Sequence, residues 1–288
     1  MRFGTPLRYP GGKGKLTDYF KEVLEVNGIN GTYIEPYAGG AGVAINLLLD
    51  GKVSDIVIND YDPSIYSFWK TLKNYPEYLL EKIDMTEISV KEWNIQREIQ
   101  QCKCTAPINT LGFSTFYLNR TNRSGVLTGG IIGGKNQTGE YKIDARYNKS
   151  ILKQRIEKIS EFSDSITVNG LDANNFLRYR LSNYKRKNTL IYIDPPYYDK
   201  GSCLYMNHYD DKDHKELAET LNPLKYKWIL SYDNVKFITD LYKGRNKTEM
   251  VLNYSSYSSR KGQEVFYSSL GLTMPSIDGE KANFNCLT

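Results

Sequence analysis

The chain has 288 residues, of which 40% are hydrophobic and 25% charged, and its net charge is +5. This composition is typical of a globular protein with a sizeable core, and it excludes an intrinsically disordered chain. No apolar run approaches the roughly 20 residues of a membrane-spanning helix, and the first residues lack the apolar centre of a secretory signal peptide.

Strand and helix patterns alternate at the start of the chain. Residues 31–36 (GTYIEP) predict a strand, which the glycine-rich YAGGAG and the apolar helical run VAINLLLD follow. Residues 54–60 (SDIVIND) predict a second strand. A helix is expected directly after it, because Pro63 suits the first turn of a helix.

The strand pattern largely disappears between residue 72 and about residue 160. Residues 76–103 have helical spacing with an interruption at Ser89, and residues 119–141 are polar and rich in glycine. An insertion at this point would leave the α/β core and form a second module at its surface. We therefore predict a discontinuous α/β domain of residues 1–71 and 160–288, and an inserted domain of residues 72–159.

The insertion also carries the positive charge. Residues 101–160 hold ten Lys or Arg and three acidic residues, so the rest of the chain is slightly acidic. A local positive surplus suits a polyanion, because neutralised phosphates release counterions. Several of these charges belong to the helical run KSILKQRIEKISEF (149–162), where they also fit an ordinary solvated helix face.

Three more strands and a hairpin are expected after the insertion. The strands are predicted at residues 164–170, 188–196 and 225–234, and the hairpin joins residues 249–255 to residues 263–270. Strands that alternate with helices favour a mostly parallel sheet with helices on both faces. The predicted fold class is therefore α/β, with a Rossmann-like sheet and an inserted, mainly helical domain.

The cysteines and histidines do not form a metal-binding pattern. The spacing of the four cysteines matches no zinc ribbon, and the two histidines complete no ligand set (Cys102, Cys104, Cys203, Cys286, His208 and His214). We expect no metal ion, and free thiols in a reducing cytoplasm. The 24 tyrosines would suit base stacking, but they equally fit a tyrosine-rich composition without special function.

Acidic residues stand at or just after the ends of four predicted strands: Glu35, Asp60, Asp172 and Asp194. In open parallel sheets, ligands bind at the carboxyl ends of the strands. Each residue alone also fits a turn or a helix cap. Four of them together with a glycine-rich loop favour a ligand site.

The loop EPYAGGAG contains Gly39, Gly40 and Gly42, which let the backbone approach a ligand closely. It lacks the spacing G-x-G-x-x-G of a dinucleotide fingerprint. Asp60 follows about 20 residues later, where a carboxylate accepts hydrogen bonds from ribose hydroxyls. The N-terminal PGGKGKLT is not a P-loop, because Tyr9 stands where the first glycine should be.

The apolar run TLIYI ends in Asp194, Pro195, Pro196 and Tyr197. The two prolines fix φ and make the turn stiff, so the Asp194 carboxylate and the Pro195 carbonyl are left as acceptors. Two neighbouring acceptors fit a planar NH2 group, and Tyr197 offers a ring face for stacking. The turn therefore suits holding an exocyclic amine for attack on an electrophile.

The order of these motifs resembles the Dam-like (D12 class) DNA adenine N6-methyltransferases over nearly the whole chain. The similar segments are LRYPGGKGKL, YIEPYAGGAGVAINL, IVINDYDPSIY, FYLNRTNRSG, IDPPYY and SSRKGQEVFYS. DPPY alone is moderately specific, because related forms serve RNA and protein amide methylation, whereas the full order is highly specific. The resemblance implies an S-adenosylmethionine-dependent methyltransferase sheet, with the discontinuous domain catalytic and the insertion recognising the target.

The resemblance implies S-adenosyl-L-methionine as methyl donor and S-adenosyl-L-homocysteine as product. The implied cofactor-binding residues are Tyr9, Lys13, Glu35, Ala38, Gly39, Gly40, Asp60, Asp172 and Asp194. Tyr9 and Lys13 would hold the methionine end, with Lys13 pairing with its carboxylate. Asp60 would accept from the ribose hydroxyls, and Asp172 from the adenine amino group.

The resemblance also implies the catalytic residues and the DNA contacts. A target adenine would flip out of duplex DNA, and Asp194 and the Pro195 carbonyl would accept its two N6 hydrogens while Tyr197 stacks on the base. Pro196 completes the catalytic turn. The implied DNA contacts are Asn119, Arg120, Arg123, Arg260 and Lys261. The middle segment departs most from the Dam pattern, since Thr121 replaces an aromatic residue, so the sequence does not predict a GATC site.

We therefore predict a site-specific DNA methyltransferase that acts on N6 of adenine, either solitary or paired with a restriction endonuclease. It is expected to be a cytoplasmic protein of bacterial or phage origin, a monomer or weak dimer without membrane contact. Two alternatives remain at this point: an RNA adenine methyltransferase, and a catalytically idle DNA-binding protein with the same fold. The intact DPPY turn argues against the idle protein.

Overall fold

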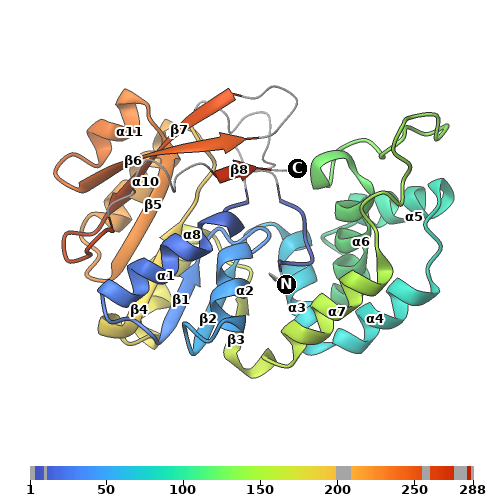
Figure 1. Cartoon of the computed structure of the whole chain (residues 1–288), viewed down its shortest axis with the longest axis horizontal. Helices are drawn as coiled ribbons and strands as arrows, with labels where there is room; N and C mark the ends of the chain where they lie inside the picture. Colours follow the sequence, from blue (N-terminus) through green and yellow to red (C-terminus); the bar gives the residue numbers. More distant parts are fainter. Residues whose placement is uncertain (1–3, 10–11, 199–208, 255–259, 276–283, 287–288) are drawn as a thin grey trace.

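The computed structural model describes residues 4–9, 12–198, 209–254, 260–275 and 284–286, and for residues 250–254, 260–263 and 284–286 it describes the backbone alone. In Figure 1 a sheet flanked by helices forms one part of the molecule, and helices α4 (Pro76–Met85) to α7 (Lys149–Ser160) form a second part beside it. The α/β architecture with an inserted, mainly helical part is thereby confirmed.

The described strands form one mixed sheet in the order β3-β2-β1-β4-β5-β7-β6-β8. They are β1 (Thr32–Glu35), β2 (Asp55–Asn59), β3 (Ile166–Asn169), β4 (Thr189–Ile193), β5 (Lys227–Asp233), β6 (Asn246–Tyr254), β7 (Arg260–Ser268) and β8 (Phe284–Cys286). Strands β1 to β5 pair in parallel, and β7 is antiparallel to both β5 and β6. The predicted strands and the C-terminal hairpin are confirmed; β8 was not predicted.

The strand β4 shows why the sequence forms this sheet. All five of its residues are buried, although successive side chains point to opposite faces. Leu190 and Tyr192 join the hydrophobic cluster on one face, and Ile191 and Ile193 join the cluster on the other. A continuous apolar run rather than an alternating one is expected where helices cover both faces of a parallel sheet.

Helices cover the two faces as a doubly wound fold requires. The first face packs against α1 (Thr17–Val26), α2 (Gly42–Leu49) and α3 (Pro63–Asn74), and the second against α8 (Ala173–Tyr179), α10 (Asp211–Leu221) and α11 (Lys236–Leu241). The chain runs from β1 outward to β2 and β3, then crosses to β4 and β5 on the other side of β1. The switch point between β1 and β4 is where ligands bind in such sheets.

The inserted part is organised around the helix α6 (Ile108–Thr121). Its residues from Leu111 to Thr121 are all buried, because α3, α4 and α5 (Val90–Gln101) surround it. Gly112 permits the close approach of α3, since a Cβ there would lie 2.4 Å from the Thr71 hydroxyl. The interruption predicted at Ser89 is the N-cap of α5, where the Ser89 hydroxyl accepts from the Glu92 amide.

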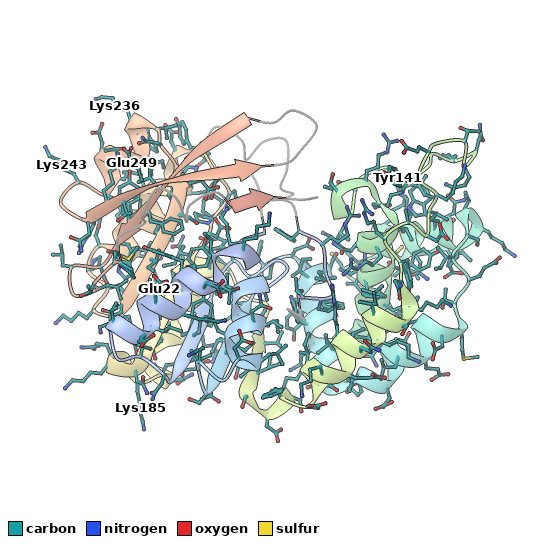
Figure 2. All side chains as sticks on the ribbon, in the orientation of Figure 1. Glu22, Tyr141, Lys185, Lys236, Lys243 and Glu249 are labelled. Atoms are coloured by element: carbon teal, nitrogen blue, oxygen red, sulfur yellow. The ribbon has the colours of Figure 1, made fainter. Side chains whose placement is uncertain are left out.

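The boundaries predicted at residues 71/72 and 159/160 stay a prediction. The described chain has no strand between β2 and β3, which agrees with an inserted domain there. However, most of α3 lies before residue 72, and this helix packs along α6 of the inserted part, so the contacts do not separate at residue 72. Figure 2 shows charged side chains such as Glu22, Lys185 and Lys243 projecting from the outer surface of the sheet part. The acidic residues predicted at the strand ends lie instead inside the molecule, at the switch point between β1 and β4.

Candidate active site

A cavity of about 1030 Å³ opens at the carboxyl ends of β1, β2 and β4. This volume is at the upper end of the range of about 300–1,000 Å³ that small-molecule sites occupy. The four acidic residues singled out at strand ends, Glu35, Asp60, Asp172 and Asp194, all line it. Four positions far apart in the sequence are therefore brought to one cavity at the switch point.

The loop between β1 and α2 is fixed by hydrogen bonds at both sides of Gly39. The Asp60 carboxylate accepts from the Gly39 amide at 2.8 Å, and the Trp69 indole donates to the Gly39 carbonyl at 2.9 Å. Gly39 has φ of +47°, and a Cβ there would lie 2.7 Å from the ring of Tyr9. Only glycine therefore lets Tyr9 lie against this backbone, and Tyr9 and Gly40 both line the cavity.

Burial changes the acidity of two carboxyl groups in the cavity wall. Asp60 accepts from the amides of Gly39 and Asp62, but burial outweighs these bonds and raises its pKa to about 7. Glu35 accepts from the Ala44 amide at 3.1 Å, and burial, with the nearby Asp194 charge, raises its pKa to about 8. Both carboxyl groups therefore change their ionisation near neutral pH, far above the pH at which exposed carboxyl groups do so.

The Glu35 proton should make the stability of the ligand-free protein depend on pH. The unfolded chain ionises Glu35 near 4.5, whereas the folded chain keeps the proton until about pH 8, so the free energy of unfolding should fall as pH rises through this window. Asp60 adds a similar fall that ends near pH 7. In urea titrations from about pH 5 to about pH 8, Glu35→Gln should flatten this fall.

Asp55→Asn is a matched control for that experiment, because Asp55 is an exposed carboxylate in the neighbouring strand β2. It should leave the pH dependence as in the unmodified protein. If Glu35→Gln retained the full fall in stability, the proton assigned to Glu35 would belong to another group.

The Asp194 carboxylate is held from two sides at the edge of the cavity. Its Oδ1 accepts from the Ser231 hydroxyl of β5 at 2.5 Å, and its Oδ2 lies 3.5 Å from the Lys13 ammonium. The carboxylate is about one-fifth exposed, and Pro196 lines the same cavity. The turn after β4 thus presents a fixed acceptor to whatever occupies the cavity.

Lys13 lies between groups of the protein itself. Its Nζ is 2.8 Å from the Tyr197 hydroxyl and 3.2 Å from Glu264 Oε1, in addition to Asp194. Glu264, in β7, is 2% exposed, and burial raises its pKa while the Lys13 charge opposes that rise. In this structure Lys13 pairs with the protein's own carboxylates, and its expected pairing with a cofactor carboxylate stays a prediction.

Tyr197 is largely enclosed by the protein. It is 8% exposed, and its ring centroid lies 6.3 Å from that of Tyr232. Its hydroxyl accepts from Lys13, so one edge of the ring is fixed. Stacking of Tyr197 on a base stays a prediction.

The D12 class N6 adenine-specific DNA methyltransferase family model matches residues 9–256. The chain belongs to this family. The match runs from Tyr9 through the glycine loop and the DPPY turn into the region of the C-terminal hairpin. As a D12-class protein it is an adenine-specific DNA methyltransferase, and neither RNA methylation nor idle DNA binding is favoured.

Two similar proteins accompany the family match. The Type II methyltransferase M.MjaIII of Methanocaldococcus jannaschii is 24% identical over 272 residues, which cover 85% of this chain and 90% of the relative. The solved rRNA methyltransferase aviRa from Streptomyces viridochromogenes aligns with 90% of this chain and 86% of its own, with a TM-score of 0.38 and 11% identity.

The D12 family uses S-adenosylmethionine as methyl donor, and the cavity fits this group. The backbone at Gly39 leaves a space that a Cβ would fill, and the Asp60 carboxylate bonds the amide of this residue. In the described structure the Lys15 ammonium is buried in the cavity wall without a hydrogen-bond partner. Ala38 lines the cavity as well, and its amide donates to the Asn59 carbonyl at 3.0 Å. Asp172 lines the cavity and also caps α8 by accepting from the Asn175 amide, and its contact with the cofactor adenine stays a prediction.

Asn119 and Arg120 of this methyltransferase do not face solvent. Asn119 is 1% exposed and bonds both the amide and the carbonyl of Arg8, at 2.7 and 2.6 Å. Arg120 is 7% exposed, donates to the Pro6 carbonyl at 2.7 Å, and has a pKa lowered by burial. In this structure their polar groups hold the N-terminal segment, and Asn119 also lines the cavity; the direct DNA contacts expected of these two residues stay a prediction.

The other residues predicted to contact DNA are placed differently. Arg123 is exposed, and its backbone amide donates to the Gly130 carbonyl. Arg260 and Lys261 begin β7, paired with Tyr254 and Asn253, and their side chains lie outside the described residues. Arg123 is thus the exposed one among the residues of the insertion that were predicted to contact DNA.

Sequence reasoning missed three residues of the site: Ser231, Glu264 and Lys15. Ser231 and Glu264 are polar residues that lie next to buried apolar residues in their strands, and this signal is visible in ILSYD and QEVFYS. In the part of the chain that the structure describes, no three His, Cys, Asp or Glu side chains gather as metal ligands. Within the same residues, no helix has the length and apolar character of a membrane span.

Proposed function

We propose that this protein transfers a methyl group from S-adenosylmethionine to N6 of an adenine that is flipped out of duplex DNA at a specific site. The observation that carries the proposal is the Asp194 carboxylate, held by Ser231 and Lys13 at the edge of a cavity of about 1030 Å³. We place a nucleoside cofactor and, next to Asp194, a purine in this cavity. A stacked adenine does not reach such an interior, so it must leave the helix at a cost of a few kcal/mol.

We assign the cofactor to the walls formed by Tyr9, Glu35, Ala38, Gly39 and Gly40. Asp60 accepts from the ribose hydroxyls, and Asp172 from the adenine amino group. When bound, S-adenosylmethionine supplies an electrophilic methyl group. The loop fixed by Asp60 and Trp69 contributes a preorganised surface, so little has to rearrange on binding.

Asp194 and the Pro195 carbonyl act on the target adenine. By accepting the two N6 hydrogens they orient the amine and draw its lone pair out of conjugation with the ring. The Ser231 hydroxyl and the Lys13 ammonium keep the carboxylate in place before the base arrives, which is the geometry that electrostatic preorganisation requires. Pro196 and Tyr197 complete the turn, with Tyr197 stacking on the base.

We propose the helical part, residues 72–159, as the target-recognition domain. Its surplus of Lys and Arg supports a role in gripping phosphates, and Arg123 is exposed. The side chains of Arg260 and Lys261 serve the same purpose at the start of β7. We further propose a monomer or weak dimer that works in the cytoplasm of a prokaryotic host. Because a relative is named a Type II methyltransferase, we propose a cognate restriction endonuclease as its partner.

Arg123→Ala should weaken DNA binding at all sequences if Arg123 grips a phosphate, and should reduce the salt slope of binding by about 1. Fluorescence anisotropy with a labelled duplex over a range of salt concentrations measures both quantities. The matched control is Lys185→Ala, an exposed charge on the sheet part away from the insertion (Figure 2). Equal salt slopes for the Arg123 variant and the unmodified protein would remove Arg123 from the DNA interface.

Expression in a methylation-deficient host, followed by single-molecule sequencing, tests the proposed function directly. We expect N6-methyladenine at one sequence context across the host genome. Transfer of labelled methyl groups to duplex DNA and to structured RNA in vitro then compares the substrates. Preferential labelling of RNA, or modified adenines without a shared context, would contradict the proposal.

A further inference from the structure

We propose that Glu264 of β7 is a positioning residue for methyl transfer, because it fixes the Lys13 ammonium that holds the catalytic turn. This inference rests on the proposed function. Glu264 does not line the cavity, so we assign it no contact with the methyl donor or with the target base. Its effect on the reaction passes through Lys13, which does line the cavity.

The Lys13 ammonium joins Glu264 to the turn after β4. Its Nζ lies 3.2 Å from Glu264 Oε1, 3.5 Å from Asp194 Oδ2 and 2.8 Å from the Tyr197 hydroxyl. A lysine side chain has a flexible stem, so its ammonium stays in one place only when fixed groups hold it. Asp194 is itself a group to be held, and Glu264 is therefore the anchor of this arrangement.

The Glu264 side chain is fixed more firmly than that of Asp194. It is 2% exposed, whereas the Asp194 side chain is 21% exposed. In the described structure Glu264 Oε2 is buried without a hydrogen-bond partner, so the carboxylate is stabilised by Lys13 and by a hydrogen bond from Tyr197. Because loss of one partner would leave a buried charge uncompensated, this carboxylate keeps the ammonium beside it.

The sheet places a second carboxylate directly opposite Glu264. In the antiparallel pair of β5 and β7, Glu264 is in register with Asp233, and both residues are buried. Like charges opposite each other in such a pair are destabilising. Asp233 Oδ1 accepts from the Tyr198 amide at 3.1 Å, so it holds the chain directly after the turn. Both acids of this unfavourable pair thus support the catalytic turn, and such local conflicts are expected at functional sites.

The test separates kcat from KM for methyl transfer to duplex DNA at saturating methyl donor. Glu264→Gln keeps the shape of the side chain but removes its charge, so kcat should fall roughly ten- to hundredfold, the scale of a displaced catalytic group. The KM for DNA should stay within about twofold, because no contact with DNA is removed. Glu264→Asp should retain more of kcat, since the long Lys13 side chain can follow the charge.

The matched control is Glu249→Gln. Glu249 is an exposed carboxylate of β6 (Figure 2), opposite Val265, the residue after Glu264. The control should leave both kcat and KM unchanged. A thermal melt verifies that each variant is folded.

A double-mutant cycle with Lys13→Met tests whether Glu264 acts through Lys13. In urea titrations the two single substitutions should cost more stability together than the double variant does, because each leaves a buried charge without its partner. The kcat of the double variant should equal that of Lys13→Met. This comparison also serves if Glu264→Gln alone does not fold.

An unchanged kcat in Glu264→Gln, or a rise in KM without a fall in kcat, would overturn the inference. So would additive losses of stability, or a further loss of kcat in the double variant beyond that of Lys13→Met. These outcomes leave the proposed function standing. If the unmodified protein transferred no methyl group to DNA, the proposed function itself would fail, whatever the urea titrations showed.

Discussion

Asp194→Ala should lower kcat for methyl transfer to DNA by at least about a hundred- to a thousandfold, the scale of losing one preorganised catalytic group. The fold should survive, because the carboxylate lies at the cavity edge. The Ser231 hydroxyl also keeps a neighbour in the Tyr192 hydroxyl, 3.0 Å away. Transfer of radiolabelled methyl groups to duplex DNA measures the rate, and a thermal melt verifies folding.

Ser231→Ala is the informative companion to Asp194→Ala. It leaves the carboxylate in place but removes the hydroxyl that fixes its Oδ1, so its loss of kcat should be clearly smaller than that of Asp194→Ala. An Asp194→Ala variant that works near the wild-type rate would refute the catalytic role. Equal losses in both variants would indicate that the carboxylate acts only when held by Ser231.

Asp60→Ala should weaken binding of S-adenosylhomocysteine by roughly 1–3 kcal/mol, the scale of lost hydrogen bonds to a charged acceptor. Two effects add here. The ribose would lose its acceptor, and the Gly39 and Asp62 amides would lose the carboxylate that they bond at 2.8 and 2.9 Å. Calorimetry at fixed pH measures the change, and an unaltered affinity would place the ribose elsewhere.

Asp60→Asn keeps the size and shape of the Asp60 side chain but removes its negative charge, so it tests the contribution of the charge to cofactor binding. Because burial raises the pKa of Asp60 to about 7, the ionised acceptor forms only as pH passes that value, so wild-type affinity should rise between about pH 6 and about pH 8. In Asp60→Asn most of this rise in affinity should be lost. Any rise that is left should come from the ionisation of Glu35, whose pKa is about 8. A wild-type affinity that falls over this range would contradict the assignment.

The strands of the parallel sheet were predictable because their signal is local. Residues 31–36, 54–60 and 188–196 were expected to be strands, and β1, β2 and β4 lie within them. Burial on both faces requires unbroken apolar runs, and glycine, proline and acidic residues at the ends show where they stop. The same ends located Glu35, Asp60 and Asp194, since a polar residue that follows such a run lies at the edge of the sheet.

The partners of these residues were not predictable, because they depend on distant parts of the chain. The Lys13–Glu264 pair joins positions 251 residues apart, and nothing near either residue indicates the other. The segment YLNR looks like a polar surface, yet Asn119 and Arg120 are buried because α6 is enclosed by other helices. Polarity alone does not distinguish a side chain that binds a ligand from one that bonds the protein's own backbone.

The hydrogen bonds from α6 to the N-terminal segment bear on how S-adenosylmethionine and DNA influence each other's binding. Asn119 and Arg120 hold Arg8 and Pro6, and Tyr9, the next residue, lies on the glycine loop. If bound DNA displaced α6, the displacement would therefore move Tyr9 and the glycine loop that we assign to the methyl donor. If DNA binding changes the dissociation constant of the cofactor in this way, thermodynamic reciprocity requires the cofactor to change the dissociation constant of DNA by the same factor.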